Sequence, residues 1–178
     1  MNVQDLIKKN HVLTQDSRTI TKDSIFFALE GTTNDGHRFV EQVLKDGAYA
    51  VVVRSSHPIT TLLLKDSTYA KKLICVSDTR EALALAACAQ YNNPSKELTV
   101  VGVTGTNGKT TSTYLLEAVL QAGGFNTAVI GTVENRLGTK IIPATHTTPD
   151  APALQKLFTR FLDDGATAVA MEVSSHAL

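Results

Sequence analysis

The fold is decided by the stretch Thr104-Gly105-Thr106-Asn107-Gly108-Lys109-Thr110-Thr111. Before it, residues 98–103 form a short apolar run that predicts a buried strand, and after it residues 109–122 have the spacing of a helix. In such a unit the glycines let backbone N–H groups curl around a phosphate, and the N-terminus of the helix adds partial positive charge. We therefore expect a phosphate-binding loop in an α/β fold.

The loop departs from the general GxxxxGK[ST] pattern. That pattern places its first glycine at position 103, which is Val103 here, whereas glycines stand at Gly102 and Gly105. We interpret the loop as a P-loop variant in which Lys109 reaches the β- and γ-phosphates and Thr110 ligates magnesium. The alternative is an ordinary glycine-rich turn, which Gly-Lys-Thr-Thr at a strand-to-helix junction disfavours.

The residues before the loop alternate between strand and helix patterns. We expect strands in four apolar or β-branched runs, at 25–29, 48–53, 62–64 and 73–76. Residues 36–47 have apolar positions on one helical face. Asp78 stands three residues before Glu81, which is the spacing of an N-terminal cap, and an Ala/Leu-rich helix is expected from there to about Gln90.

The same alternation continues after the loop. Strands are expected at 127–130 and 166–173, and 133–142 is interpreted as a hairpin that turns near Leu137-Gly138. In Thr148-Pro149-Asp150 we expect a capping hydroxyl, a proline at the first helical position and an acidic residue in the first turn of a helix to about Asp164.

A polar segment divides the chain. Asn92–Lys96 contains the helix-breaking Pro94, and we place a domain boundary there, giving domains 1–94 and 95–178. Alternating strands and helices predict mostly parallel sheets in both. The second domain, at about 80 residues, is short for an α/β nucleotide-binding domain, so we expect it to be truncated.

Composition excludes several classes of protein. With 17 basic and 17 acidic side chains the formal net charge is zero, which argues against a dedicated nucleic-acid binder or a polybasic membrane-surface protein. Cys75 and Cys88 lack a CxxC or Cys/His context, so neither a disulfide framework nor a zinc site is expected. The polar N-terminus lacks the apolar run of a signal peptide or membrane helix. A soluble, cytoplasmic protein without membrane insertion fits best.

Two further features carry candidate chemistry. Glu172 ends the last expected strand, where P-loop proteins commonly place a carboxylate that holds magnesium, although pairing with a surface cation is equally compatible with its position. The turn 146–150 is either a helix cap or an anion-binding helix start. Ser174-Ser175-His176 lacks the GxSxG context of a nucleophile.

Together these motifs resemble the Mur ligase family, the ATP-dependent amide-forming enzymes of peptidoglycan synthesis. The loop at 104–111 looks like that family's own P-loop version, and the segments 147–150 and 171–176 look like its substrate and metal motifs. Five further segments are similar to its UDP-binding domain: Asp16-Ser17-Arg18, Phe26-Phe27-Ala28-Leu29, Gly31, Asp35-Gly36-His37 and Gly47-Ala48.

The resemblance implies roles residue by residue. It implies that ATP is held by Gly105, Thr106, Asn107, Gly108, Lys109, Thr110 and Thr111, with Lys109 as the catalytic residue. It implies Mg²⁺ ligands at Thr110 and Glu172. Contacts to a UDP-N-acetylmuramoyl-dipeptide substrate are implied at Gln15, Ser17, Thr32, Thr33, Asn34, His146, Thr147, Thr148 and Ser174.

The implied reaction is activation of the D-glutamate carboxylate of UDP-MurNAc-L-Ala-D-Glu by ATP, followed by attack of the amine of diaminopimelate or lysine on the acyl phosphate. We expect a monomer with a role in cell-wall biogenesis, cell shape and cell division, and no ligation by these 178 residues alone. The alternatives are a folylpolyglutamate or cyanophycin synthetase, a non-catalytic nucleotide-binding module, and a P-loop kinase or GTPase.

Overall fold

The chain folds into two compact units in a computed structural model, which describes residues 11–31, 34–144 and 146–175. The units are Met1–Gln90 and Tyr91–Leu178. Their junction follows the end of a helix and contains two consecutive asparagines, Asn92 and Asn93, in the left-handed backbone region. Asparagine tolerates this conformation better than most residues, so the turn suits its sequence.

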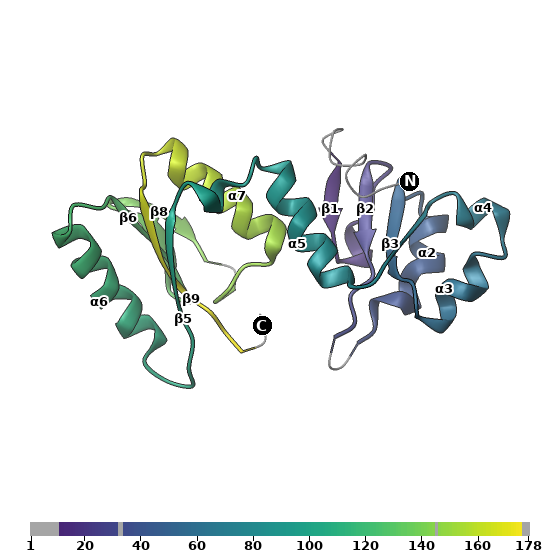
Figure 1. The fold of residues 1–178 in the computed structure, drawn as a ribbon, viewed down its shortest axis with the longest axis horizontal. Helices are drawn as coiled ribbons and strands as arrows, with labels where there is room; N and C mark the ends of the chain where they lie inside the picture. The colour runs from purple at the N-terminus through teal and green to yellow at the C-terminus, as the bar shows by residue number, and fades with distance from the viewer. Residues whose placement is uncertain (1–10, 32–33, 145, 176–178) are drawn as a thin grey trace. The chain divides into compact units, whose positions relative to one another are not determined.

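The first unit is built around a parallel four-stranded sheet in the order β1-β2-β3-β4 (Figure 1). Its strands are β1 (Val12–Thr14), β2 (Ser24–Phe27), β3 (Ala50–Arg54) and β4 (Leu73–Val76). Its helices are η1 (Ser17–Thr19), η2 (Gly36–Phe39), α2 (Val40–Lys45), α3 (Pro58–Leu63), α4 (Ser67–Ala70) and α5 (Thr79–Gln90).

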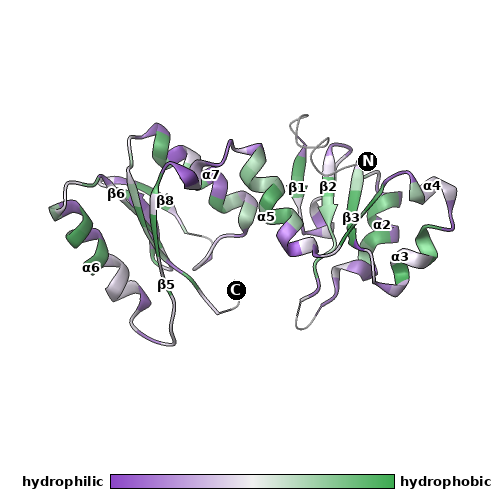
Figure 2. Cartoon of the chain, viewed as in Figure 1, coloured by the Kyte–Doolittle hydropathy of each residue, from purple (hydrophilic) through white to green (hydrophobic). Residues whose placement is uncertain are grey.

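Both faces of this sheet are covered. Phe26, Val51 and Val53 point to one face and form a buried cluster with Val43 of α2 and Leu63 of α3. The alternate strand positions face the other way, where α5 packs against β1, β2 and β3. Strands that are buried on both faces read as continuous apolar runs, which is how β2 and β3 could be predicted from sequence. The edge strand β4 is a similar apolar run, although Cys75 is exposed. The strands carry the hydrophobic colour in Figure 2.

The strand expected at Leu62–Leu64 is wrong, because these residues belong to α3 and its end. His57 caps this helix by accepting a hydrogen bond from the Ile59 amide, and Pro58 occupies its first turn. Ile59 and Leu63 are four residues apart and meet the same core, which is a helical and not a strand spacing. In the same unit, the sequence pattern gave no sign of the short β1.

The second unit holds a mixed five-stranded sheet in the order β5-β9-β6-β7-β8. Its strands are β5 (Thr99–Val103), β6 (Thr127–Ile130), β7 (Glu134–Leu137), β8 (Lys140–Pro143) and β9 (Ala168–Glu172). Strands β5, β9 and β6 are parallel, whereas β6, β7 and β8 pair antiparallel, so the expected hairpin is confirmed. Its helices are η3 (Pro94–Lys96), α6 (Lys109–Ala122) and α7 (Ala151–Asp163).

Helices α6 and α7 lie on opposite faces of this sheet (Figure 1). Phe158 and Phe161 of α7 pack with Ile130, Val169 and Met171 in the buried core of one face. The alternate positions of β9, including Glu172, therefore point to the face on which α6 packs.

The start of α7 differs from the expected one. Asp150, not Thr148, is the N-terminal cap, and its side chain accepts a hydrogen bond from the Ala153 amide. The proline in the first turn is Pro152, not Pro149. In the described ranges, no helix combines the length and apolar character needed to cross a membrane.

Candidate functional site

The candidate site lies where three adjacent parallel strands end. Val103, the last residue of β5, pairs with Glu172, the last residue of β9, and on the other side Ile130 of β6 pairs with Met171. The loops that follow these strands therefore start at one edge of the sheet, where α/β proteins commonly bind ligands. The sheet register thus brings together the P-loop variant, Glu172 and Thr132.

The P-loop variant joins β5 to α6 as the sequence predicts, and α6 has the expected bounds. Gly108 forms the N-terminal cap in the left-handed region, at φ 79°, and no side chain caps the helix. A residue with a side chain would be strained there. The uncapped amide groups of α6 remain free to face an anion. Within the loop, the Lys109 Nζ donates a hydrogen bond to the Gly105 carbonyl at 2.8 Å.

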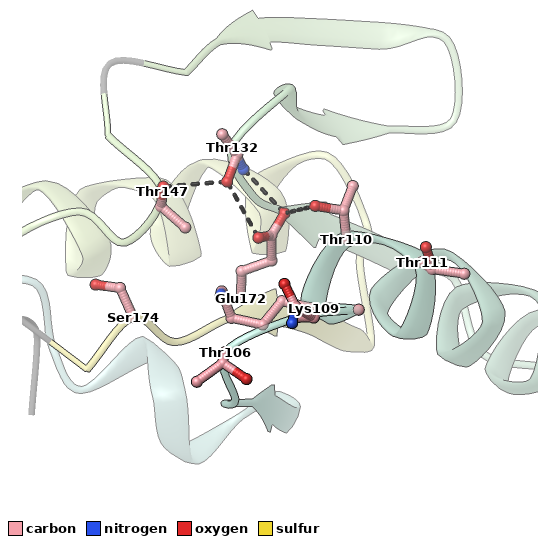
Figure 3. A pocket seen from close by; sticks show the side chains of 10 residues that line it. Thr106, Lys109, Thr110, Thr111, Thr132, Thr147, Glu172 and Ser174 are labelled. Carbon is pink, nitrogen blue, oxygen red and sulfur yellow. Dashed lines mark hydrogen bonds between the residues drawn. The ribbon is translucent and has the colours of Figure 1, made fainter.

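Glu172 is the polar centre of the site, with only 2% of its surface exposed. Its Oε1 accepts hydrogen bonds from the Thr110 hydroxyl and the Thr132 amide, both at 3.0 Å. Its Oε2 lies 3.1 Å from the Thr132 hydroxyl, which is also 3.0 Å from Thr147 Oγ1 (Figure 3). Thr132 was not foreseen from sequence. Its position two residues after the strand 127–130 is the signal that could have indicated it.

Gly131 explains how Glu172 fits beside β6. A Cβ atom at this position would lie 2.4 Å from Glu172 Oε1, which is closer than real Cβ contacts come, and 3.2 Å from its Cδ. The absence of a side chain therefore leaves the space that the carboxylate occupies. Because Thr132 follows Gly131, this close approach also brings the Thr132 amide into reach of Glu172.

The oxygen atoms present fit a magnesium ion. Mg²⁺ prefers carboxylate and hydroxyl oxygens, and Thr110 and Glu172 supply one of each within hydrogen-bonding distance. A carboxylate has about four acceptor positions, and the three hydrogen bonds above leave one on Oε2. The donors are hydroxyls and an amide, not cations, so they leave the charge of Glu172 without a neutralising partner among these contacts.

The pocket around Glu172 has a volume of about 360 Å³. Ten residues line it: Thr106, Asn107, Gly108, Lys109, Thr110, Thr111, Thr132, Thr147, Glu172 and Ser174. Figure 3 shows Thr147 on the far side of Thr132 from Thr110, and the side chains of Lys109 and Thr106 on the P-loop side of the pocket. Every loop residue expected to hold ATP lines the pocket except Gly105, whose carbonyl accepts the Lys109 bond.

The expected substrate residues of the second unit separate into two groups. Thr147 and Ser174 line the pocket, whereas Thr148 and His146 are not among its lining residues. The Thr148 hydroxyl donates to the Glu172 carbonyl and accepts from the Ser174 amide, both at 2.9 Å. Its one proton is thereby used to hold the turn against the end of β9.

The other expected substrate residues belong to the first unit. Ser17 opens η1 and Gln15 precedes it, while Asn34 is exposed and accepts a hydrogen bond from the Gly31 amide. Thr32 and Thr33 lie outside the described residues. Next to Ser17, hydrogen bonds from Arg18 lower the pKa of Asp16 to about 2, so this acid is ionised at neutral pH.

A second cluster of polar groups surrounds Asp35. Its carboxylate accepts hydrogen bonds from His37 Nδ1 at 2.8 Å and His57 Nε2 at 2.9 Å, and the two rings stack at 4.0 Å. Since His37 Nε2 accepts from the Arg54 amide, its Nδ1 carries the proton. Burial opposes ionisation of Asp35, but the bonds from the backbone and ring of His37 and from His57 outweigh it and lower the pKa.

This cluster does not fit a metal. Glu30, His37 and His57 bring potential ligand atoms within 4.8 Å of one another. However, both ring nitrogens of His37 are used in hydrogen bonds, Glu30 pairs with Arg54, and His57 is bonded to Asp35 and the Ile59 amide. The cluster holds Glu30, Asp35 and His37 to one another and to Arg54 at the end of β3.

Two family descriptions match the two units. The "Mur ligase family, catalytic domain" matches residues 9–91, and the "Mur ligase middle domain" matches residues 103–178. The chain belongs to the Mur ligase family. The sequence-based resemblance is therefore confirmed, and the α/β architecture agrees with solved Mur ligase structures.

Individual Mur ligases resemble the chain along nearly its full length. It is 44% identical over 177 residues to the UDP-N-acetylmuramoyl-L-alanyl-D-glutamate–2,6-diaminopimelate ligase of Geobacter sulfurreducens, covering 98% of this chain and 33% of that protein. The ligase of the same name from Aquifex aeolicus is 40% identical, with 100% and 35% covered. A solved structure of a ligase with this name matches with a TM-score of 0.64 at 27% identity, covering 93% and 32%.

The Mur ligase relatives are much longer than the chain. It spans about a third of the length of the curated relatives it matches.

Proposed function

We propose that this chain supplies the substrate-binding and nucleotide-binding parts of an ATP-dependent ligase that adds 2,6-diaminopimelate to UDP-MurNAc-L-Ala-D-Glu. The observation that carries the proposal is the pocket in which the P-loop variant, Thr110 and Glu172 meet. The diaminopimelate specificity rests on the names of relatives that are 38 to 46% identical over nearly the whole chain.

In this proposal Gly105–Thr111 hold the phosphates of ATP. The uncapped N-terminus of α6 faces the phosphate oxygens, and Lys109 turns from the Gly105 carbonyl to the β- and γ-phosphates. Thr110 and Glu172 hold Mg²⁺, which would neutralise charge on the transferring phosphoryl group. Because the site is assembled from the ends of rigid strands, these groups need little reorganisation when the nucleotide binds.

Thr147 and Ser174 contact the muramyl-peptide part of the UDP-sugar, and Gln15 and Ser17 contact its UDP end. Thr32, Thr33 and Asn34 form a second segment that contacts the substrate. The substrate carboxylate attacks the γ-phosphorus of ATP, which gives an acyl phosphate and releases ADP. The amine of the incoming amino acid then attacks the acyl carbon and displaces phosphate. We assign Thr148 to positioning the turn, since its proton is already engaged, and His146 to contact with the substrate.

Binding of the UDP-sugar tests this proposal. About two thirds of the length of the relatives has no counterpart in this chain, so we expect binding without turnover. Isothermal titration of the chain with UDP-MurNAc-L-Ala-D-Glu should give a saturable signal that weakens about fivefold in Ser17→Ala, the loss of one hydrogen bond. Thr68→Ala, which removes an exposed hydroxyl from α4, serves as the control.

Absence of binding by a folded chain, or equal binding in Ser17→Ala and the wild type, would contradict the substrate assignment. Titration with UDP alone separates recognition of the uridine diphosphate from recognition of the dipeptide. Titration with GTP in place of ATP distinguishes a ligase from a GTPase. Equal binding of the two nucleotides would be evidence for a GTPase.

A further inference from the structure

We propose that Arg136 is a positioning residue for the nucleotide. By holding helix α6 to strand β7, it fixes Lys109 and Thr110 of the phosphate-binding loop where ATP and its cation bind. This inference rests on the proposed function and adds a residue that is not among those lining the pocket. The observation behind it is an ion pair between Arg136 and the buried Glu117 of α6.

The two long helices of the second unit bury different kinds of side chain. Helix α7 places Phe158 and Phe161 in the apolar core of its face of the sheet. The fully buried side chains of α6 are Thr113 and Glu117, whereas Leu115 of the same helix is 63% exposed. Apolar packing is non-directional, but hydrogen bonds require particular distances and angles. Polar contacts therefore take a large part in fixing α6 on the sheet.

Side-chain hydrogen bonds join α6 to two strands. In its first turn the Thr110 hydroxyl donates to Glu172 of β9 at 3.0 Å, and two turns later Glu117 Oε2 accepts from Arg136 Nη2 of β7 at 2.6 Å. The first bond belongs to the ligand site, where a bound cation can change it. The second lies about 10 Å further along the helix, at a rise of 1.5 Å per residue. It therefore holds α6 independently of the ligands.

The surroundings of Arg136 make this hold rigid. Its guanidinium carbon lies 5.2 Å from the centroid of the Tyr114 ring, and its Nε lies 2.9 Å from Glu134 Oε1. Tyr114 and Glu117 are three residues apart and share one face of α6. Glu134 and Arg136 are two residues apart and share one face of β7. The planar guanidinium thus contacts the helix at two points and its own strand at a third, so its orientation is fixed.

The position of α6 matters because three parts of the phosphate site belong to this helix. Lys109, Thr110 and the uncapped amides of the first turn must meet the phosphates and the cation at the same time. Groups that are already in place when the ligand arrives bind it more tightly, since they need not be ordered on binding. A helix that can shift on the sheet presents these groups in many arrangements, few of which fit the ligand. Loss of Arg136 should therefore lower the affinity for ATP with Mg²⁺.

Four variants separate positioning from stability. Arg136→Met keeps an unbranched side chain but leaves Glu117 charged and unpaired. Removing one partner of a buried ion pair is strongly destabilising, whereas removing both is tolerated. The double variant Glu117→Gln/Arg136→Met therefore lacks the hold without leaving a buried charge. Arg136→Lys keeps a cation opposite Glu117. Lys140→Met, which removes the ion pair of Lys140 with Asp164 between β8 and the end of α7, is the matched control.

The experiment is isothermal titration of each chain with adenylyl imidodiphosphate in saturating Mg²⁺, with urea unfolding of the same samples. We expect about a tenfold loss of affinity in Arg136→Met and in the double variant, because small displacements of positioned groups are costly. Arg136→Lys should stay within about threefold of the wild type, and Lys140→Met should equal it. The urea midpoint should fall in Arg136→Met and recover in the double variant. If Arg136→Met does not fold, the double variant decides.

The contrary outcomes distinguish this inference from the proposed function. If the wild type binds the nucleotide and the double variant binds it equally well, Arg136 acts on stability alone and its positioning role falls, while the proposed function stands. The same conclusion follows if Lys140→Met loses as much affinity as the double variant. If a folded wild-type chain does not bind the nucleotide, the proposed function fails together with this inference.

Discussion

Asp35 in the first unit and Glu172 in the second are both carboxylates that collect hydrogen bonds at the ends of strands, but they collect them from different donors. Asp35 is bonded by two stacked imidazole rings, one of them fully buried. Glu172 is bonded by hydroxyls of residues that line a pocket.

The difference shows how a structural carboxylate can be told from a functional one. An imidazole ring that is hydrogen-bonded through both nitrogens cannot rotate without losing these bonds. The side chains around Asp35 therefore have one arrangement and a structural role. Hydroxyls rotate at little cost, so Glu172 can exchange its donors for a ligand. We therefore expect substitutions at Asp35 to change stability and substitutions at Glu172 to change binding.

Replacement of Glu172 by glutamine should have the largest effect. The amide keeps the shape of the side chain but removes the charge that a magnesium ion needs. A hydrogen-bonded or coordinated charge contributes about 1.5–3 kcal/mol, so the gain in ATP affinity on adding Mg²⁺ should fall about 10- to 100-fold in isothermal titration. Glu97→Gln, an exposed glutamate of the same unit, is the control. An unchanged dependence on Mg²⁺ in Glu172→Gln would remove Glu172 from the metal site.

Gly131→Ala should reproduce much of this loss without touching a polar atom. The new Cβ would overlap Glu172 Oε1, so the carboxylate must leave its position between Thr110 and Thr132. We expect about a tenfold loss of Mg²⁺-dependent ATP affinity, and overpacking that costs about 1–3 kcal/mol. Because both substitutions act on one carboxylate, the double variant with Glu172→Gln should bind no more weakly than Glu172→Gln alone. Additive effects would show that Gly131 acts elsewhere.

Asp35→Ala should destabilise the first unit and leave ATP binding unchanged. It deprives the buried His37 ring of its acceptor, and an unsatisfied buried donor costs about 1–3 kcal/mol. Hydrogen exchange of the β3 amides measures this loss in the first unit alone. Asp46→Ala, at the exposed end of α2, should change the free energy of opening obtained from the same hydrogen exchange by less than about 0.5 kcal/mol. Similar exchange in the two variants would mean that the histidines find other partners.

The smallest effect concerns pH. Since folding lowers the pKa of Asp35 below its ordinary value, ionised Asp35 stabilises the first unit above the unfolded-state pKa, and this contribution is lost as the pH falls through the folded-state pKa. Protection of the β3 amides should therefore decline below about pH 4 in the wild type and more gently in Asp35→Asn. Parallel pH profiles of the two proteins would assign the decline to other carboxylates.

The sequence could predict the elements that depend on local patterns of residues. Continuous apolar runs and helix caps act locally, so β3, β4, the Asp78 cap and the whole of α6 were predictable. The three-residue run at Leu62–Leu64 was misread because three residues cannot distinguish a period of 2 from a period of 3.6. The antiparallel strands β7 and β8 form the expected hairpin, which the sequence indicated only by its turn.

Within the site, local motifs predicted residues and the register decided their contacts. The P-loop and the strand-end position of Glu172 were visible in the sequence. That Glu172 would share Thr132 with Thr147 depends on the order β5-β9-β6, which places the ends of β9 and β6 side by side. A single threonine after a strand carries no motif. Likewise, the role of Thr148 as a clamp depends on its contact with the end of β9.

The central claim, that the Glu172 pocket is a site for ATP with magnesium, is tested most directly by one comparison. The chain is titrated with ATP in Mg²⁺ and again in excess EDTA, with Lys109→Ala measured in parallel. We expect saturable binding that Mg²⁺ tightens at least about tenfold and that Lys109→Ala weakens to a similar extent. Equal affinity with and without Mg²⁺, or binding that does not respond to the loss of Lys109, would contradict the claim.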